Sequence, residues 1–296
     1  MQPWWLDAVC GPDRWNVSLA FDAGGEICGA LPYNITRVLG LQFIKMPPLT
    51  DYIGPWILPA DDRIEKSERK YAYEKKVIAD LVEGLPRVHF FNQQYYPGFA
   101  NWLPFYWKGY RQTTYYTYRF DDLSDLDAIY DGFKNTVRTD IKKAEDKATV
   151  AIGDNLSDFY RLQQQHKHAP SKQILERLDQ ALALHGQRQI FLAFDRETGK
   201  TIAGLYVVWD RHTAYFMMAA IDAAFRQHAA LHLLYWEAIR QMAAFVQAID
   251  LCGSILPGPE HFSRSLGARQ TPHFRVYKTG NKFLRMISLL LNKGYD

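Results

Sequence analysis

Residues 189–278 contain an ordered series of strand and helix signals, and this series restricts the possible fold more than any other feature of the chain. Two extended runs, Gln189–Asp195 and Thr201–Trp209, flank a turn that contains Gly199, which predicts a β-hairpin. A third extended run follows at Thr213–Ile221. A long helix comes next, because apolar residues recur at helical spacing, namely Leu231, Leu234, Tyr235, Ala238, Ile239, Met242 and Val246.

After this helix the sequence predicts a short strand over Ala248–Ser254, a short helix that Gly267 ends, and a last strand that ends in Lys278. A helix between two strands is a crossover connection and joins parallel strands, whereas a hairpin joins antiparallel strands. The series therefore predicts mixed sheets with flanking helices, an α+β fold.

The first part of the chain repeats this order of elements with unrelated residues. The predicted strands are Trp15–Asp22, Glu26–Ile35, Gly40–Met46, Arg87–Phe91 and Gln112–Arg119, and the predicted helices are Asp62–Val82 and Asn101–Trp107. A length of 296 residues fits two domains better than one. We therefore expect two structurally similar halves, residues 1–121 and residues 122–296, that pack without a flexible linker.

Residues 122–148 connect the two halves. An apolar stripe from Leu126 to Ala144 predicts one continuous helix over Asp122–Ala148. Another face of this helix carries basic residues at i, i+4 and i+8, namely Lys134, Arg138 and Lys142. Further helices are expected at Leu156–His168 and Ser171–His185, before the second hairpin.

Composition and charge exclude several classes of protein. A hydrophobic content of 48% predicts folded cores without a long disordered tail, and a net charge of +3 is too small to imply a nucleic-acid partner by itself. The three cysteines are widely spaced, so we expect neither structural disulfides nor a metal site. The sequence has no signal-peptide pattern and no apolar run of membrane-spanning length. These features predict a soluble cytoplasmic protein without a membrane span, and they leave the oligomeric state open.

Several short runs of the second half have distinctive residue patterns. They are R-x-x-A-A at Arg226–Ala230, L-L-x-W-E-A-I at Leu233–Ile239, D-x-x-G-S at Asp250–Ser254 and F-x-R-S-x-G-A at Phe262–Ala268. In these runs and in its order of elements, the chain resembles the FemAB-like, or BioF2-like, branch of the GNAT acyltransferase superfamily. The resemblance extends from residue 3 to residue 278. It implies two tandem GNAT-like halves, of which the first lacks its usual N-terminal elements.

The resemblance implies transfer of an acyl group to an amine, carried by a small molecule, a sugar or a cell-envelope precursor. The implied donor site combines the strand before the crossover helix with the start of that helix, at Met218, Ala219, Arg226, Ala229 and Ala230. GNAT loops have glycine where this chain has Ala229, and the added Cβ narrows the approach of a phosphate. A coenzyme A thioester and aminoacyl-tRNA, which the best-known FemAB-like proteins use, both stay open as donors. For Arg226, the alternative to donor binding is a solvated side chain at a helix start.

Three carboxylates near the implied site are candidates for the general base, which needs a pKa raised towards neutrality by burial: Asp250, Glu237 and Asp222. Asp250 is the first candidate, because a carboxylate within an apolar strand usually has a specific task. Its alternative is an ion pair with a neighbouring strand, and Glu237 has the alternative of a solvated side chain. Cys252 is expected to be a small core residue, because the sequence places no partner to activate it.

The loop Met46–Pro55 resembles a proline-rich run of the family, and we expect it to bind the acceptor. Asp51 and Tyr52 offer hydrogen bonds there, and a rigid buried loop is the alternative. Residues 90–118 contain thirteen aromatic side chains. Their spacing favours core packing over the stacking of sugars or bases.

Basic residues offer further contacts with ligands. Arg138 and Lys142, within a run similar to the family's R-x-x-I-x-K-A, are candidates for binding a phosphate-bearing acceptor or tRNA, with a solvated helix face as the alternative. Arg264 either binds an anion of the donor or pairs with Glu260 one helical turn earlier. Because the glycine loop is absent, a non-catalytic double GNAT fold that binds a polyanion or a glycan is the alternative function.

Overall fold

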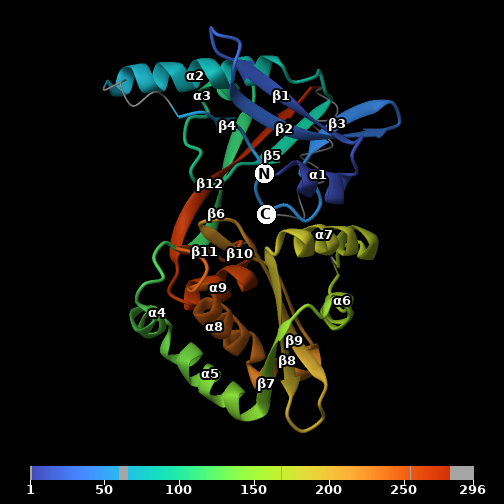
Figure 1. Ribbon diagram of the computed structural model, residues 1–296, viewed down its shortest axis with the longest axis vertical. Helices are drawn as coiled ribbons and strands as arrows, with labels where there is room; N and C mark the ends of the chain where they lie inside the picture. The colour runs from blue at the N-terminus through green and yellow to red at the C-terminus, as the bar shows by residue number, and fades with distance from the viewer. Residues whose placement is uncertain (1, 60–65, 168, 254, 281–296) are drawn as a thin grey trace. The chain divides into compact units, whose positions relative to one another are not determined.

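The computed structural model describes residues 2–59, 66–167, 169–253 and 255–280. The chain forms two compact units (Figure 1). Unit 1 contains the described residues up to Tyr115 and those from Pro272 onward, and unit 2 contains Tyr116–Thr271. The division of the chain into domains at residues 121 and 122 stays a prediction.

Unit 1 is built on a mixed sheet. Its strands, in spatial order, are β1 (Trp15–Phe21), β2 (Ile27–Val38), β3 (Leu41–Lys45), β5 (Phe90–Gln94) and β12 (Arg269–Thr279), and β4 (Trp56–Ile57) pairs with β2. The hairpin β1–β2 is antiparallel, and Gly25 in its turn has a φ of +86°, a conformation that favours glycine. The strands β3 and β5 are parallel, because a long connection with a helix joins them.

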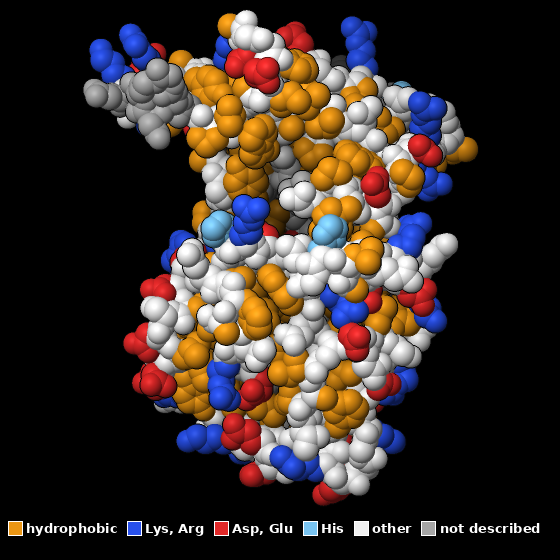
Figure 2. Space-filling model, in the orientation of Figure 1, with side chains coloured by type: hydrophobic (Ala, Val, Ile, Leu, Met, Phe, Trp, Pro, Cys, Tyr) orange, Lys and Arg blue, Asp and Glu red, His pale blue; other side chains and the backbone are white. Residues whose placement is uncertain are grey.

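Helix α2 (Ser67–Glu83) packs on the sheet of unit 1, where its Val77, Ile78 and Leu81 are buried. Gly29 on β2 permits this close packing, because a Cβ there would lie 2.5 Å from a methyl carbon of Val77. The unit also contains α1 (Pro3–Cys10) and α3 (Leu103–Trp107). The predicted core packing of aromatic residues is confirmed at Phe91, Tyr95, Phe99, Phe105 and Tyr110. Others, such as Tyr106 and Trp107, are exposed, and Figure 2 shows broad areas of hydrophobic atoms on this unit.

Unit 2 also has a mixed sheet. Its strands, in spatial order, are β6 (Arg111–Phe120, of which Tyr116–Phe120 belong to this unit), β11 (Ala248–Asp250), β10 (Thr213–Ile221), β9 (Thr201–Trp209), β8 (Arg188–Asp195) and β7 (Ala148–Gly153). Among the described strand pairs of this unit, β10 and β11 are the parallel ones, and the helix between them is α8 (Ala230–Met242). The predicted hairpin of the second half is therefore present as β8 and β9.

Helices cover both faces of the unit 2 sheet (Figure 1). One face carries α8 together with α4 (Leu126–Gly132), α5 (Asn135–Lys147) and α9 (Pro257–Ser265). The other face carries α6 (Leu156–Gln163) and α7 (Lys172–His185). Gly204 on β9 lets α6 approach the sheet, because a Cβ there would lie 2.8 Å from the Phe159 ring. The core thus has one layer on each side of the sheet.

Each half of the chain supplies the closing strand of the other unit. The strand β6 ends the first half of the sequence, yet its Arg119 and Phe120 pair with β11 in unit 2. The strand β12 ends the second half, yet Arg275–Thr279 pair with β5 in unit 1. This exchange of closing strands makes each sheet from residues that are far apart in the sequence.

Several sequence predictions differ from the structure. The helix predicted over Asp122–Ala148 is two helices, because Phe133 and Lys134 are extended and the Lys134 N–H donates to the Ser265 carbonyl at 2.9 Å. Residues 148–153 form the unpredicted strand β7, and the strand predicted at Arg87–Phe91 begins instead at Phe90. The strand predicted over Ala248–Ser254 ends at Asp250, because the Cys252 N–H turns back to the Asp250 carboxylate, and the helix predicted over Leu156–His168 ends at Gln163. Ser254, His168 and residues 62–65 of the predicted helix Asp62–Val82 lie outside the described residues.

Candidate functional site

The strands β10 and β11 part in the middle of unit 2. Their parallel pairing runs from Thr213↔Ala248 to Tyr215↔Asp250, where β11 ends. The next residues of β10 contain a bulge between Phe216 and Met218, after which β10 continues only beside β9. The remaining part of β10, which includes the predicted donor residues Met218 and Ala219, therefore has one edge without a strand partner among the described residues. The Ala219 carbonyl accepts a hydrogen bond from Gln163 Nε2 of α6 at 3.3 Å.

The connection from β10 to α8 positions the start of that helix. Asp222 caps the short 3-10 helix η1 (Ala223–His228) by accepting from the Ala224 N–H at 3.0 Å. Ala229 then adopts a left-handed conformation with a φ of +53° and leads into α8 at Ala230. No side chain caps this helix start. The His232 N–H donates to the Ala229 carbonyl at 2.9 Å, so the N–H groups of Ala230 and Leu231 are those that can attract an anion.

Two histidine–aspartate pairs lie on either side of Ala229. His228 Nδ1 is 3.4 Å from Asp195 Oδ1, and His232 Nδ1 is 3.3 Å from Asp140 Oδ2. Burial lowers the pKa of His232, which also stacks on the Phe262 ring. Hydrogen bonds from Thr198 lower the pKa of Asp195, so this carboxylate is ionised at neutral pH. The cationic side chain at this helix start is Arg226, which is exposed.

Asp250 is fully buried at the end of β11 and has several hydrogen-bond donors around it. It accepts from the Thr117 hydroxyl, from the Cys252 N–H at 2.8 Å and from Arg119 Nη1 at 3.1 Å. Burial raises the pKa of Asp250, while these donors act in the opposite direction. The ion pair with Arg119 on β6 is the alternative that the sequence left open for Asp250.

These contacts fix the turn that follows β11. Cys252 has a left-handed φ of +50°, and the Gly253 N–H donates to Thr117 Oγ1 at 3.0 Å. A Cβ on Gly253 would lie 2.7 Å from the Thr117 Cα, so only glycine fits so close to β6. Asp250 therefore holds the turn by which the chain leaves the sheet, next to the point where β10 and β11 part.

The two other predicted bases lie in different surroundings. Glu237 on α8 forms an ion pair with Arg240 at 3.0 Å on the exposed side of the helix. Asp222 serves as the cap of η1. The catalytic roles predicted for Asp250, Glu237 and Asp222 stay predictions, and the structure gives each of them a local structural contact.

The sequence analysis assigned no functional role to two tyrosines of unit 2. Tyr235 on α8 is buried between Phe216 and Phe262, and burial raises the pKa of its hydroxyl. Tyr118 on β6 donates to Glu260 Oε1 at 2.6 Å, and Arg264 Nε donates to the same oxygen at 2.9 Å. These bonds lower the pKa of Glu260. Arg264 thus has the ion pair that was one of its two predicted roles, and its donor contact stays a prediction.

The basic face predicted on one helix is divided by the break between α4 and α5. Lys134 precedes α5 as its N-cap residue. Arg138 bridges the break, because its guanidinium donates to the Asp131 carbonyl at 2.9 Å and to Asn135 Oδ1 at 2.6 Å. Lys142 is exposed on α5. Binding of an acceptor by Arg138 and Lys142 stays a prediction.

The predicted acceptor loop of unit 1 occupies the end of the β3–β5 pair. The Ile53 N–H donates to the Gln94 carbonyl at 2.8 Å, and Ile53 forms a parallel bridge with Tyr95. Tyr52 places its ring edge-on against His273 of β12, with 5.1 Å between the ring centroids. Asp51 is exposed beside it. The loop is thus anchored at Ile53, while Asp51 and Tyr52 stay candidates for contact with an acceptor.

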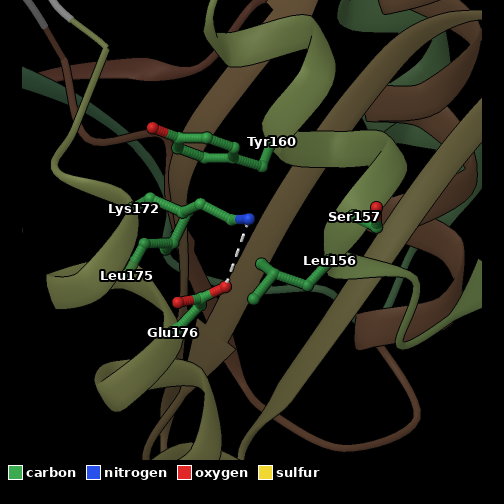
Figure 3. A pocket seen from close by; sticks show the side chains of 6 residues that line it. All are labelled: Leu156, Ser157, Tyr160, Lys172, Leu175 and Glu176. Atoms are coloured by element: carbon green, nitrogen blue, oxygen red, sulfur yellow. Dashed lines mark ion pairs between the residues drawn. The ribbon is translucent and has the colours of Figure 1, made fainter.

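A cavity of about 160 Å³ lies between α6 and α7 (Figure 3). Its lining residues are Leu156, Ser157, Tyr160, Lys172, Leu175 and Glu176. Lys172 Nζ lies 3.7 Å from Glu176 Oε1, and both side chains are exposed. The cavity contains none of the predicted site residues, and its single charged pair is already matched.

Two further properties concern the described residues alone. Within them, no group of three or more histidine, cysteine, aspartate or glutamate side chains is arranged to hold a metal ion. No helix in the same ranges is long and apolar enough to cross a membrane. The cytoplasmic location stays a prediction.

Comparisons with known proteins identify the fold. No curated protein sequence matches the chain. The crystal structure of FemX has a TM-score of 0.61 and 11% sequence identity, with 92% of this chain and 90% of FemX covered. The C-terminal domain of a putative lysylphosphatidylglycerol synthetase from Agrobacterium fabrum has a TM-score of 0.54 and 12% identity, with 97% and 89% covered. A tandem GNAT protein from the clavulanic acid biosynthesis pathway has a TM-score of 0.52 and 11% identity, with 93% of each chain covered.

These similarities confirm the predicted α+β fold of two tandem GNAT-like halves and the resemblance to the FemAB-like branch at the level of the fold. A family model described as an acetyltransferase (GNAT) domain matches residues 111–264, which is more than half of the chain. The match includes β10, η1, α8 and β11, the elements that surround the parting strands. The chain therefore belongs to the GNAT acetyltransferase family.

Proposed function

We propose that this chain transfers an acyl group from a coenzyme A thioester to an amine, on a small molecule or on a sugar-linked or cell-envelope acceptor. One observation carries the proposal. The β10–β11 pairing ends at Tyr215↔Asp250, and the uncapped start of α8 follows β10 in the same unit. Family membership supports acyl transfer in general. The donor and the acceptor are the proposed part.

In this proposal the free edge of β10 at Met218 and Ala219 binds the extended arm of the donor through backbone groups. The N–H groups that follow Ala229, with the exposed Arg226, bind its pyrophosphate, because a helix start attracts anions. Holding donor and acceptor in line supplies much of the rate enhancement for an already activated thioester. Backbone N–H groups at the parting strands stabilise the oxyanion.

Proton transfer needs one group to accept a proton from the amine and another to donate one to the leaving thiolate. Asp222 and Glu237 are the candidate bases that retain some exposure. Asp250 is fully buried and surrounded by donors, which favours a positioning role at the turn after β11. Tyr235 is a candidate donor because its ring lies beside Phe216 at the β10 bulge, although burial raises the pKa of its hydroxyl and so weakens it as an acid.

An aminoacyl-tRNA donor is the second candidate. The Cβ of Ala229 at the helix start narrows the approach of a pyrophosphate, which is the observation that favours it. One structural neighbour is named a putative lysylphosphatidylglycerol synthetase, a name that points to an aminoacyl group. Arg138 and Lys142 are the candidate contacts for a tRNA phosphate.

Ligand-induced stabilisation distinguishes these donors. Thermal unfolding is measured with acetyl-CoA, a longer acyl-CoA and charged tRNA, each in excess. A true donor at about 100 times its dissociation constant adds about 2.7 kcal/mol to the free energy of unfolding. We expect this shift with an acyl-CoA. A shift with charged tRNA alone would replace coenzyme A by the second candidate.

The Arg226→Ala variant tests the position of the donor. A phosphate contact is present in the ground and transition states alike, so the KM for acyl-CoA should rise while kcat changes little. Arg211→Ala is the matched control, because Arg211 is equally exposed and lies before β10 instead of after it. An unchanged KM in Arg226→Ala would remove this residue from the donor site.

A further inference from the structure

A half-buried arginine in unit 1 has no acidic partner among the residues that the structure describes. Arg275 Nε donates to Asn92 Oδ1 at 2.8 Å, and its Nη1 donates to the Tyr115 hydroxyl at 2.6 Å. The guanidinium carbon also lies 5.6 Å from the centroid of the Tyr115 ring. These partners are all neutral, so they orient the guanidinium without compensating its charge.

Partial burial of an uncompensated charge costs free energy, and an ionic partner offsets that cost. A guanidinium has more N–H donors than Asn92 and Tyr115 accept, so Arg275 retains donors for a ligand. Its planar fork matches the oxygens of a carboxylate or a phosphate, and the two hydrogen bonds hold that fork in one orientation. These features are those of an anion site.

His273 adds a second polar group on the same face of β12, because alternate residues of a strand point to the same side. Its side chain is 4% exposed, and its Nδ1 has no hydrogen-bond partner among the described residues. Burial lowers the pKa of His273 to about 4, against a backbone hydrogen bond to Tyr95. The neutral ring therefore donates to the Tyr95 backbone and leaves Nδ1 as an acceptor.

The two groups are joined by Tyr115. Its ring meets His273 edge-on, with 6.0 Å between the centroids, and its hydroxyl accepts from Arg275. Tyr52 of the acceptor loop covers the other side of His273. Tyr52, Tyr115 and Arg275 each retain some exposure, so a ligand can reach them from solvent.

We propose that Arg275, oriented by Tyr115 and Asn92 next to the buried His273, forms a binding site for a carboxylate or phosphate group. The ligand contacts Tyr52 of the acceptor loop. Its identity as the acceptor rests on the proposed function, whereas anion binding does not.

Nuclear magnetic resonance tests anion binding without turnover. The imidazole Cε1–H signal of His273, assigned with His273→Gln, is followed while inorganic phosphate or acetate replaces chloride at constant ionic strength. We expect a saturable shift with at least one of the two anions, and the stronger one identifies the anionic group. If replacing chloride by either anion leaves the His273 signal unshifted, the proposed site is wrong.

Variants assign the binding to the guanidinium. Arg275→Gln should lower the affinity for the anion about tenfold or more, because hydrogen bonds to charged groups contribute more than neutral ones. Arg37→Gln removes an exposed arginine of the same unit and should leave the affinity unchanged. Tyr115→Phe retains the charge but releases the fork, and it should weaken binding a few-fold. Equal affinities in wild type, Arg275→Gln and Tyr115→Phe would contradict the proposal.

Kinetics then test whether this anion belongs to the acceptor. Arg275→Gln should raise the KM for the acceptor and leave the KM for acyl-CoA unchanged. An unchanged acceptor KM with anion binding retained in wild type would assign the site to another ligand. If none of the donors supports turnover, the proposed function fails while the binding measurement still decides the anion site.

Discussion

Two parallel strand pairs among the described residues, β3–β5 and β10–β11, end differently. In unit 1 the chain leaves β3 and returns at Ile53, which pairs with Tyr95 just beyond β5. In unit 2 the pairing of β10 with β11 stops at Tyr215↔Asp250. The end of the first pair is thus occupied by the chain's own loop, and the end of the second is followed by an uncapped helix start.

This difference shows that the same order of elements can leave the end of a strand pair open or fill it with a loop. A GNAT donor needs unpaired backbone where two strands part, and unit 2 retains it. Unit 1 uses the equivalent place for a proline-rich loop that brings Tyr52 to His273. In the functions proposed above, the donor binds in unit 2 and the anionic ligand binds in unit 1.

The largest expected effect concerns the filled end of the unit 1 pair. Gly54 has a φ of +130°, and a Cβ there would lie 2.7 Å from the buried Tyr95 ring. Gly54→Ala should lower the free energy of unfolding by about 3 kcal/mol, from backbone strain and overpacking together. Gly40→Ala is the control, because Gly40 has a φ of +77° but open space around it, and it should cost only about 1 kcal/mol. Equal losses in urea denaturation would mean that the loop is not tightly packed.

The second prediction concerns pH. His273 has a folded pKa of about 4, below its ordinary value of 6.5, so the unfolded chain takes up the proton first as the pH falls. Stability is therefore fully present above pH 6.5 and decreases towards pH 4, by up to about 3 kcal/mol. Asp250 acts with the opposite sign, because burial favours its protonated form.

Urea denaturation at several pH values between 7 and 4 measures this effect, which we compare between wild type and His273→Gln. The variant should lose most of the slope in this window. The same slope in both proteins would show that His273 is not buried as a neutral ring beside the loop that fills the unit 1 strand end.

The smallest effect concerns the open end in unit 2. Ala229→Gly should lower the KM for acyl-CoA, because removal of the Cβ widens the approach to the helix start. It should also change the free energy of unfolding by no more than about 1 kcal/mol, towards greater stability, since glycine adopts a left-handed φ without strain. Ala223→Gly, at an ordinary helical position of η1, should instead destabilise. A higher KM in Ala229→Gly would place the donor elsewhere.

The sequence predicted the local elements well, because their signals lie within each segment. The hairpin around Gly199 and the apolar face of α8 are examples. The break at Phe133 and Lys134 was missed because it depends on a hydrogen bond to Ser265, which is remote in the sequence. Pairings between β6 and β11 and between β12 and β5 are also non-local, and periodicity within a strand contains no information about its partner.

The candidate site was predictable in its position more than in its contacts. The order of elements indicated the start of α8, and the apolar residues around Asp250 made this carboxylate the first candidate. Burial of Asp250 with Thr117 and Arg119 required the placement of β6, which no motif indicates. Arg275 and His273 alternate along β12, and this polar alternation in a strand was a signal in the sequence that could have been used.

The exchange of closing strands has a consequence for any attempt to produce one half of the chain alone. A fragment that ends at residue 121 would lack the β12 partner of β5, and its complement would lack the β6 partner of β11. Each fragment would then expose an unpaired sheet edge, which invites aggregation.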